Sequence, residues 1–250
     1  MIIIKSQSEI NKIAAACRIV AEILEGLKAF VKIGISTADI EAYVDREINK
    51  RGATPAFKGY RGYPSSVCIS VNEQVVHGIP SMAARLKNGD IVSIDLGAIL
   101  DGFYGDAALT IPVGDISPEA SRLIMVTEEA FYKGIEKAVA GNRVSDISAA
   151  IQDHVESNGF SVVRAFVGHG IGRSLHEEPQ VPNFGKPGQG PRLKEGMTMA
   201  VEPMVNAGGP DVKILDDGWT AITADGSLSA HYEHTVVITK NGAEILTKLS

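Results

Sequence analysis

Five residues of the types that bind divalent cations recur along the chain: Asp95, Asp106, His169, Glu202 and Glu233. Each lies in a strand-like or glycine-rich stretch. Four carboxylates that converge in a partly buried pocket would repel one another and lose hydration, so such an arrangement requires protonation or bound cations. Two divalent ions plus a hydroxide would nearly neutralise them. The set therefore predicts a centre for two divalent metal ions.

The donor atoms of this set are carboxylate oxygens and an imidazole nitrogen, with no thiolate among them. This chemistry argues against a structural zinc knot and favours an open site that takes water together with Mn, Fe, Co, Zn or Ni. Paired metals of this kind generate hydroxide at neutral pH and polarise a carbonyl group. Hydrolysis is the natural reaction of such a site.

A hairpin is predicted to position the two aspartates. Residues 90–100 and 103–113 read as strands on either side of the Asp101-Gly102 dipeptide, which is a strong signal for a two-residue turn. Such a turn places Leu100 opposite Phe103, and the register of the remaining pairs follows from that one.

In this register Asp95 faces Ala108, and Asp106 is its diagonal neighbour on the same face of the hairpin. Diagonal neighbours lie roughly 7–8 Å apart, close enough for both carboxylates to reach one cation. The alternative is a pair of solvated aspartates on an outer face. The apolar strand around Asp95 argues against it, because an unpaired charge there would be costly.

His169 and His176 stand in the segment GHGIGRSLHEEP. A spacing of seven places them on opposite faces of a regular strand, but Gly168, Gly170 and Gly172 allow the backbone to turn and both rings to point inward. A lone histidine is more often a packed core residue than a ligand. Two within one glycine-rich segment favour a site.

Strands over residues 197–205 and 231–239 are expected to carry the two glutamates. Alternation places Glu202 on the face opposite the apolar side chains of its strand, and Pro203 marks a strand end or edge. Taken separately, Glu202 and Glu233 could both be surface charges. Their significance lies in the complete set.

Two pairs of helices surround these strands in the predicted α+β fold, in which the sheet is antiparallel. The second pair repeats the first at an offset of 107 residues between Gly52 and Gly159 and of 109 between Ser8 and Ser117, which suggests two related halves, although coincidence between ordinary helix pairs is the alternative. The expected helices span residues 8–34, 36–52, 117–140 and 145–159.

Composition narrows the class of protein. With 250 residues, 44% of them hydrophobic, the chain can bury a sizeable core, and a net charge of −6 without a basic run argues against nucleic-acid binding. No phosphate-binding glycine motif, signal peptide or membrane span is evident. Two cysteines, Cys17 and Cys68, fit a reducing compartment, so a cytoplasmic protein is expected.

The motifs Asp-x10-Asp, GHGIGRSLHEEPQV, the Glu202-Pro203 strand and YEHT resemble those of type I methionine aminopeptidases, and the likeness runs along essentially the whole chain. The resemblance implies a pita-bread fold: one catalytic domain with pseudo-symmetric halves over residues 1–116 and 117–250. It also implies removal of the initiator methionine from nascent chains whose second residue is small.

The resemblance assigns roles to the metal set. Asp95 would bind one ion, His169 and Glu202 would lie at the other, and Asp106 and Glu233 would bridge both. Glu202 would also take and return the proton of the reacting water.

Two further histidines and an apolar pocket follow from the same resemblance. His77 would contact the amide nitrogen of the substrate, and His176 would stabilise the oxyanion of the tetrahedral intermediate. The pocket for the methionine side chain would be formed by Phe57, Tyr60, Tyr63, Cys68, Leu175 and Trp219.

Three residues depart from the family pattern. Leu175 stands where an aromatic residue is common, and Phe57 where a cysteine is common, so the finer side-chain preference could differ. His231 stands where glutamine is frequent and could tune the metal centre, whereas His234 is expected only to pack. The resemblance also suggests a monovalent cation near Asn72 and Ser229.

Nascent polypeptides, and transiently the ribosome, are the expected partners of a monomer that contacts neither nucleic acid nor membrane. One rival is a proline-specific peptidase of the same fold, such as prolidase or aminopeptidase P. Those proteins usually carry an additional N-terminal domain, whereas this chain is expected to begin with the catalytic half. The other rival is a non-catalytic binding module on the same scaffold, which would be expected to have lost metal ligands.

Overall fold

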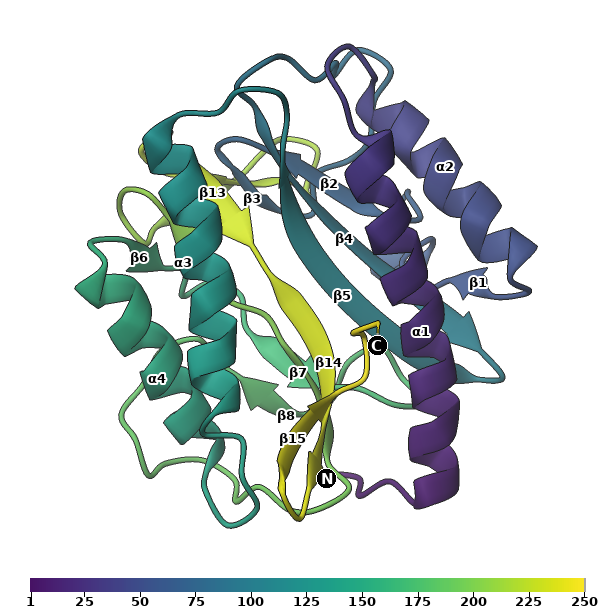
Figure 1. Ribbon diagram of the computed structural model, residues 1–250, viewed down its shortest axis with the longest axis vertical. Helices are drawn as coiled ribbons and strands as arrows, with labels where there is room; N and C mark the ends of the chain where they lie inside the picture. The colour runs from purple at the N-terminus through teal and green to yellow at the C-terminus, as the bar shows by residue number, and fades with distance from the viewer. Residues whose placement is uncertain (250) are drawn as a thin grey trace.

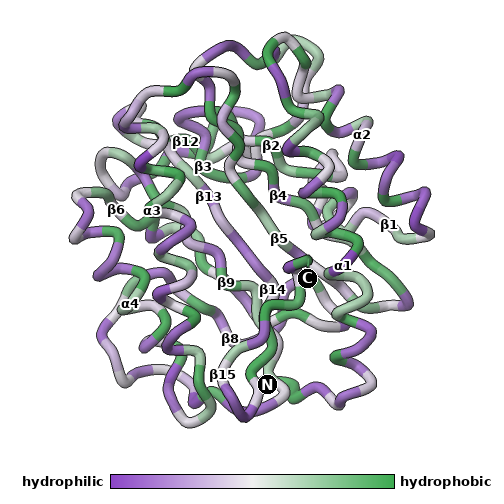
Figure 2. Tube along the Cα trace, in the orientation of Figure 1, coloured by the Kyte–Doolittle hydropathy of each residue, from purple (hydrophilic) through white to green (hydrophobic). Residues whose placement is uncertain are grey.

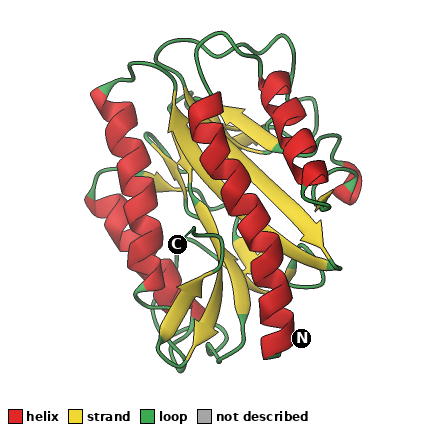
Figure 3. Ribbon diagram, turned by 45° about the vertical axis from the view of Figure 1, so that its right-hand side comes forward, coloured by secondary structure: helices red, strands yellow, loops and turns green. Residues whose placement is uncertain are grey.

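Two pairs of helices pack against the same side of a curved antiparallel sheet (Figure 1), in a computed structural model that describes residues 1–249. Figure 3 shows the helices in front of the strands. The described helices are α1 Gln7–Phe30, α2 Thr37–Lys50, α3 Pro118–Ile135 and α4 Val144–Ser157, with a short 3-10 turn over Tyr60–Gly62. None of these helices is both long enough and apolar enough to cross a membrane.

The main sheet joins strands from both halves of the chain. Its order is β1 Thr54–Pro55, β4 Ile91–Leu100, β5 Phe103–Pro112, β14 Glu233–Thr239, β9 Thr198–Val201, β7 Gly168–Gly170 and β8 Glu177–Val181. Two further strands pair at its sides: β2 Cys68–Val71 with β4, and β15 Gly242–Ile245 with β14.

Two three-stranded sheets complete the fold. One contains β13 Ser229–His231, β10 Met204–Asn206 and β6 Ser161–Val162. The other contains β11 Val212–Ile214, β12 Ala221–Thr223 and β3 Gln74–Val76. The predicted α+β class with an antiparallel sheet flanked by helices is confirmed, but the helices cover one side of the sheet and do not surround it.

The predicted ends of the long helices were wrong by several residues. α1 begins at Gln7 because Ser6, not Ser8, is its N-cap: the Ser6 hydroxyl accepts the Glu9 N–H and the Glu9 carboxylate accepts the Ser6 N–H. It ends at Phe30, because the backbone is already extended at Val31. α3 likewise ends at Ile135 and not near residue 140, because tight turns follow it.

The repeat predicted from the helix pairs is present in the structure. α2 and α4 both contain 14 residues. An isolated β-bridge lies before each helix, Ser36–Arg85 before α2 and Arg143–Arg192 before α4, and both residues of the second bridge lie 107 positions after those of the first. In each half the arginine guanidinium also donates to a glycine carbonyl, at 2.9 Å in the first and 3.0 Å in the second. Equivalent polar contacts thus fix the start of each short helix.

Each half has its own apolar core between its helices and the sheet. α1 and α2 share one cluster with β4, and α3 and α4 share another with β9 and β14. In Figure 2 much of α2 is coloured as hydrophilic, as expected for a helix that buries only one stripe. The halves therefore fold around separate cores and meet through the shared sheet.

The hairpin register agrees with the prediction at every pair. Leu100 lies opposite Phe103 and Asp95 opposite Ala108, and the turn residues Asp101 and Gly102 have φ of 50° and 75°. Two consecutive positive φ angles match the right-handed twist of the strands. The turn therefore sets the register that places both aspartates on one face.

α1 packs closely against the other face of this hairpin. A Cβ atom at Gly105 would lie 2.5 Å from the backbone nitrogen of Cys17, so only glycine allows this approach. Side chains alternate along a strand, which directs Asp106 away from α1. The cluster of acidic residues consequently lies on the face of the sheet opposite the helices.

The predicted strands over 197–205 and 231–239 are each interrupted: the first at Pro203, where a strand end or edge was expected, and the second at a position where no break was expected. The first breaks at Glu202-Pro203 and the second at Tyr232, whose N–H donates to the Pro203 carbonyl at 3.2 Å. Proline has no N–H for a sheet ladder, so pairing cannot continue through it. β9 pairs with β14 in the main sheet, and β10 pairs with β13 in a smaller sheet. Both segments of the chain therefore leave the main sheet at the same point.

Candidate active site and metal centre

One cavity of about 340 Å³ gathers all thirteen residues that the sequence predicted for the site. It lies where the two interrupted strands leave the main sheet, on the face away from α1. Its polar floor carries the five predicted metal ligands, and apolar side chains form an adjoining wall. The lining residues from the prediction are Phe57, Tyr60, Tyr63, Cys68, His77, Asp95, Asp106, His169, Leu175, His176, Glu202, Trp219 and Glu233.

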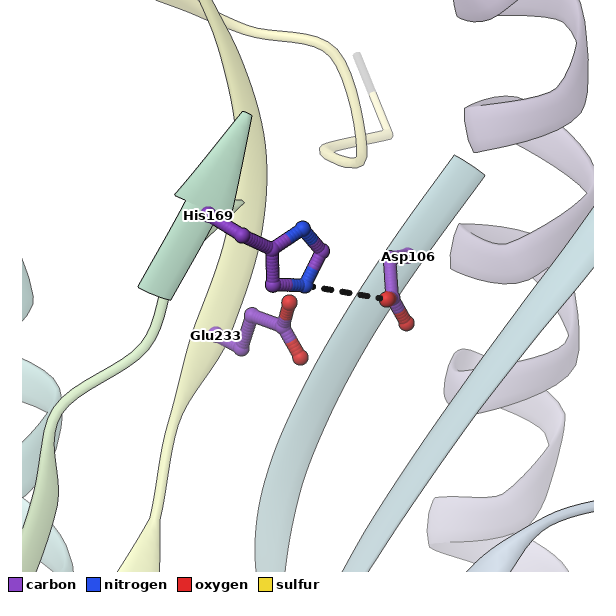
Figure 4. A group of neighbouring side chains, drawn as sticks. All are labelled: Asp106, His169 and Glu233. Carbon is purple, nitrogen blue, oxygen red and sulfur yellow. Dashed lines mark ion pairs between the residues drawn. The ribbon is translucent and has the colours of Figure 1, made fainter. Parts of the chain in front are cut away.

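Three strands of the main sheet bring three of the ligand candidates close together. Asp106 of β5, His169 of β7 and Glu233 of β14 each offer one atom, and these atoms lie within 4.8 Å of one another (Figure 4). Nε2 of His169 is 3.8 Å from Oδ2 of Asp106 and 3.6 Å from Oε1 of Glu202. Asp95 lines the same cavity from β4.

The glycines around His169 serve close packing and not a backbone turn, which corrects the predicted reason for their presence. Neither Gly168 nor Gly170 has a positive φ. A Cβ at Gly168 would lie 2.4 Å from the Ala200 carbonyl oxygen, and one at Gly170 would lie 2.3 Å from that of Glu178. The glycines allow β7 to lie close between β8 and β9. In this position β7 places the His169 imidazole in the cavity.

Both histidines of the glycine-rich segment point inward, as predicted. The rings of His169 and His176 have centroids 4.1 Å apart, and the Tyr60 ring stacks on His176 at 5.2 Å. Nδ1 of His169 lies 2.9 Å from the Gly170 carbonyl oxygen. If Nδ1 carries the proton it donates to that carbonyl, leaving the Nε2 lone pair free to bind a cation.

Burial dominates the electrostatics of the acidic groups. It raises the pKa of Asp95 to about 7. Burial, followed by repulsion from neighbouring carboxylates, also raises the pKa values of Asp106, Glu202 and Glu233 well above the ordinary range. Burial lowers the pKa of His169 to about 4. Without cations, the site thus favours protonated carboxyls beside a neutral imidazole.

The donor atoms of this cluster suit divalent cations. Oδ1 of Asp95, Oδ1 of Asp106 and Oε1 of Glu233 are buried without a hydrogen-bond partner among the described residues. Buried oxygens of this kind are rarely left unpaired. Carboxylate oxygens and an imidazole nitrogen that converge on one point are suitable donors for such ions.

His231 lies beside this cluster although it is not on a continuous strand with Glu233. Its Nε2 is buried without a hydrogen-bond partner in the described chain and lies 3.7 Å from Oε2 of Glu202. His234 points away from the cavity, as predicted, and its ring nitrogens lie 2.8 Å from Oγ1 of Thr247 and 3.1 Å from the Tyr232 hydroxyl.

An apolar wall adjoins the acidic floor. Phe57, Tyr63, Cys68 and Leu175 are buried in one cluster, against which Trp219 is packed. The Tyr63 and Trp219 rings meet edge to face at 5.2 Å. The six side chains assigned to the methionine pocket thus line a continuous surface.

His77 stands at the edge of this wall in an unusual backbone conformation. Its φ is 61°, which few residues other than glycine adopt. Its ring contacts Phe166 and Trp219 edge to face, with centroids 5.3 Å and 6.4 Å away. Burial lowers the pKa of this ring, so its neutral form is favoured.

Several residues that line the cavity were not predicted from the sequence, among them Arg61 and Phe166. Arg61 follows Tyr60 and lies over its ring at 5.4 Å from the centroid. Both lie in connecting segments without periodicity, where no sequence pattern shows which side chains point inward. Near the suggested monovalent site, the Ser229 N–H donates to the Asn72 carbonyl at 2.9 Å.

Comparison with known proteins identifies the family of this chain. The sequence profile of metallopeptidase family M24 matches residues 11–240. A methionine aminopeptidase of Clostridium perfringens is 59% identical over 247 residues, which cover 99% of both chains.

Solved structures show the same relationship. The methionine aminopeptidase of Thermotoga maritima superposes with a TM-score of 0.98 at 50% identity and full coverage of both chains. Prolidase from Pyrococcus furiosus superposes with a TM-score of 0.81 at 26% identity, and 66% of that chain is covered. The chain shares the pita-bread fold with both proteins and belongs to metallopeptidase family M24, within its type I methionine aminopeptidases.

Proposed function

We propose that this protein is a hydrolase that removes methionine from the amino terminus of peptides, and that its substrates are nascent proteins whose second residue is small. The observation that carries the proposal is the junction of an acidic cluster with an apolar wall in one cavity. The acidic cluster can hold the metal ions at which a free amino terminus would bind, and the apolar wall suits a thioether side chain, which contacts aromatic rings favourably.

The metal centre is proposed to hold two divalent ions, drawn from Co, Mn, Fe, Zn or Ni. Asp95 would bind one ion, His169 and Glu202 the other, and Asp106 and Glu233 both. When bound, such ions polarise a carbonyl group and lower the pKa of a water molecule. The unpaired buried oxygens of Asp95, Asp106 and Glu233 support this assignment.

The chain's own groups would orient the substrate. The methionine side chain would lie against Leu175 and Trp219, beside the acidic floor. His77 would contact the amide nitrogen of the scissile bond. His176 lines the same cavity, and partial burial together with the adjacent His169 ring lowers its pKa. Its neutral ring would donate an N–H to the carbonyl oxygen as negative charge develops.

Glu202 is proposed to move the proton. Burial raises the pKa of its carboxyl, and a raised pKa suits a group that accepts a proton from the attacking water and delivers it to the leaving amine. The Nε2 atoms of His169 and His231 lie on either side of the carboxylate, at 3.6 Å and 3.7 Å from its oxygens. The position at the end of β9, beside Pro203, orients this side chain.

An assay with Met-Ala-Ser against Xaa-Pro peptides tests the proposal. Methionine release from Met-Ala-Ser, with no cleavage of the Xaa-Pro peptides, is expected. Cleavage confined to the Xaa-Pro peptides would identify a proline-specific peptidase instead. Binding of methionyl peptides without hydrolysis under anaerobic Fe(II), Mn(II) and Co(II) would identify a binding module.

Further features of the proposal concern organisation and partners. One catalytic domain would comprise halves 1–116 and 117–250 and act as a monomer in the cytoplasm, with transient contact to the ribosome. The two separate cores support this division. A monovalent cation is proposed near Asn72 and Ser229, whose backbones are joined by a hydrogen bond.

A further inference from the structure

The segment from residue 171 to 176, here called the 171–176 loop, carries two residues of the proposed substrate site. Leu175 is 2% exposed within the apolar wall, and His176 stacks between Tyr60 and His169. The loop lies between β7 and β8, and only a few backbone hydrogen bonds hold it. Its position therefore depends on side chains that bind its backbone.

Glu177 binds the backbone of this loop directly. Oε1 of its carboxylate accepts the N–H of Arg173 at 2.9 Å and that of Ser174 at 3.3 Å. The side chain is 7% exposed, so the carboxylate is almost completely removed from water. One buried carboxylate thus fixes the turn that precedes Leu175 and His176.

Lys5 neutralises this carboxylate from the opposite end of the sequence. Its ammonium group forms an ion pair with Oε2 of Glu177, and its side chain is only 3% exposed. The ammonium also donates to the Ile3 carbonyl at 3.2 Å, and the Lys5 N–H donates to the Gly196 carbonyl at 2.8 Å. The N-terminal segment is therefore held in place where it meets the loop.

The ion pair is packed closely against Gly172. A Cβ at Gly172 would lie 2.6 Å from Cε of Lys5 and 2.7 Å from Oε1 of Glu177. A buried ion pair contributes little net stability, but removal of one partner leaves an uncompensated charge that must be hydrated or expelled. Loss of either partner would consequently displace the loop and not merely loosen it.

We propose that Lys5 and Glu177 are positioning residues for the reaction: through the 171–176 loop they set the places of Leu175 and His176 in the substrate site. The inference rests on the proposed function of that cavity. It assigns a role in catalytic efficiency to the N-terminal segment, whose residues 1–6 are not among those that line the cavity.

The test uses Lys5→Met, Glu177→Gln and the double variant Lys5→Met/Glu177→Gln. Each single neutralising substitution should lower kcat/KM for Met-Ala-Ser on the order of 10- to 100-fold, because small displacements of reacting groups have effects of this size. KM should rise as Leu175 moves, and kcat should fall as His176 moves.

Coupling and specificity are checked within the same series. The double variant should lose less activity than the product of the two single losses, because it leaves no unpaired charge. Lys28→Met and Glu25→Gln provide a matched control, since that ion pair is exposed on α1 with side-chain exposures of 55% and 59%. These control variants should retain wild-type kcat/KM.

Hydrogen exchange in the metal-free protein provides a readout that does not depend on activity. The Arg173 and Ser174 amides should exchange faster in Lys5→Met and Glu177→Gln, and the emission of Trp219, the only tryptophan, should change with the position of Leu175. If wild-type protein fails to release methionine, the proposed function fails, whereas the exchange data still test the loop.

Two results would overturn the inference. The first is unchanged kcat/KM and unchanged exchange at residues 173 and 174 in both single variants. The second is a loss of activity that follows the unfolded fraction or the loss of bound metal, measured by circular dichroism and calorimetry. Either outcome would leave the ion pair as a purely structural contact.

Discussion

Replacement of Asp95 by asparagine should stabilise the metal-free protein while it impairs metal binding. Asp95 lies in the acidic cluster with an unpaired buried oxygen, and burial raises its pKa from 3.8 to about 7. The folded state therefore disfavours the charged carboxylate. Asparagine has a similar shape without the charge, and neighbouring carboxylates can accept its N–H groups.

The magnitude follows from the pKa difference. A carboxyl with a raised folded-state pKa contributes stability that is complete below pH 3.8 and is lost as the pH rises through about 7. Between pH 5 and pH 8 this loss amounts to on the order of 3 kcal/mol, and asparagine has no such loss. The charge of Asp95 also raises the pKa values of Asp106, Glu202 and Glu233, so its removal acts in the same direction at these carboxyls.

Thermal unfolding of chelator-treated protein measures this difference. The melting temperature of Asp95→Asn minus that of wild type should be larger at pH 8 than at pH 5 by about 6–12 °C. This follows because 1 kcal/mol corresponds to roughly 2–4 °C in a chain of this size. Asp101→Asn, at the exposed turn of the same hairpin, is the matched control and should show no such trend. A constant or shrinking difference for Asp95→Asn would refute the electrostatic reasoning.

Three further substitutions test individual parts of the site. Glu202→Ala should abolish methionine release while some metal binding remains by calorimetry, and retained activity would exclude it as the proton carrier. Asp106→Asn should abolish hydrolysis in assays with added metal, and full activity would contradict a bridging role. Gly168→Ala should lower stability by roughly 1–3 kcal/mol and weaken metal binding through His169, because its Cβ would lie 2.4 Å from the Ala200 carbonyl oxygen; an unchanged melting temperature would show that β7 can shift without cost.

Local signals explain why the hairpin could be predicted from the sequence. The Asp101-Gly102 turn has one favoured geometry, and that geometry alone determines that Asp95 lies opposite Ala108. The serines and glycines that start and stop the paired helices are equally local, and their offsets of 107 and 109 residues suggested the two halves. These features depend on residues within a few positions of one another.

Features set by distant contacts could not be predicted in the same way. The interruptions at Glu202-Pro203 and Tyr232 lie beside each other because two strands leave the main sheet together. Arg61 lies in a short turn without periodicity, and Lys5 meets its partner Glu177 across 172 positions of sequence. Spacing carries no information about such contacts.

Release of methionine from a panel of Met-Xaa peptides, measured across defined metals, tests the central claim most directly. The account predicts no release after chelation, recovery on addition of divalent ions, and fastest release when the second residue is small. Release that persists without metal, or that is absent with every metal in the panel, would contradict it.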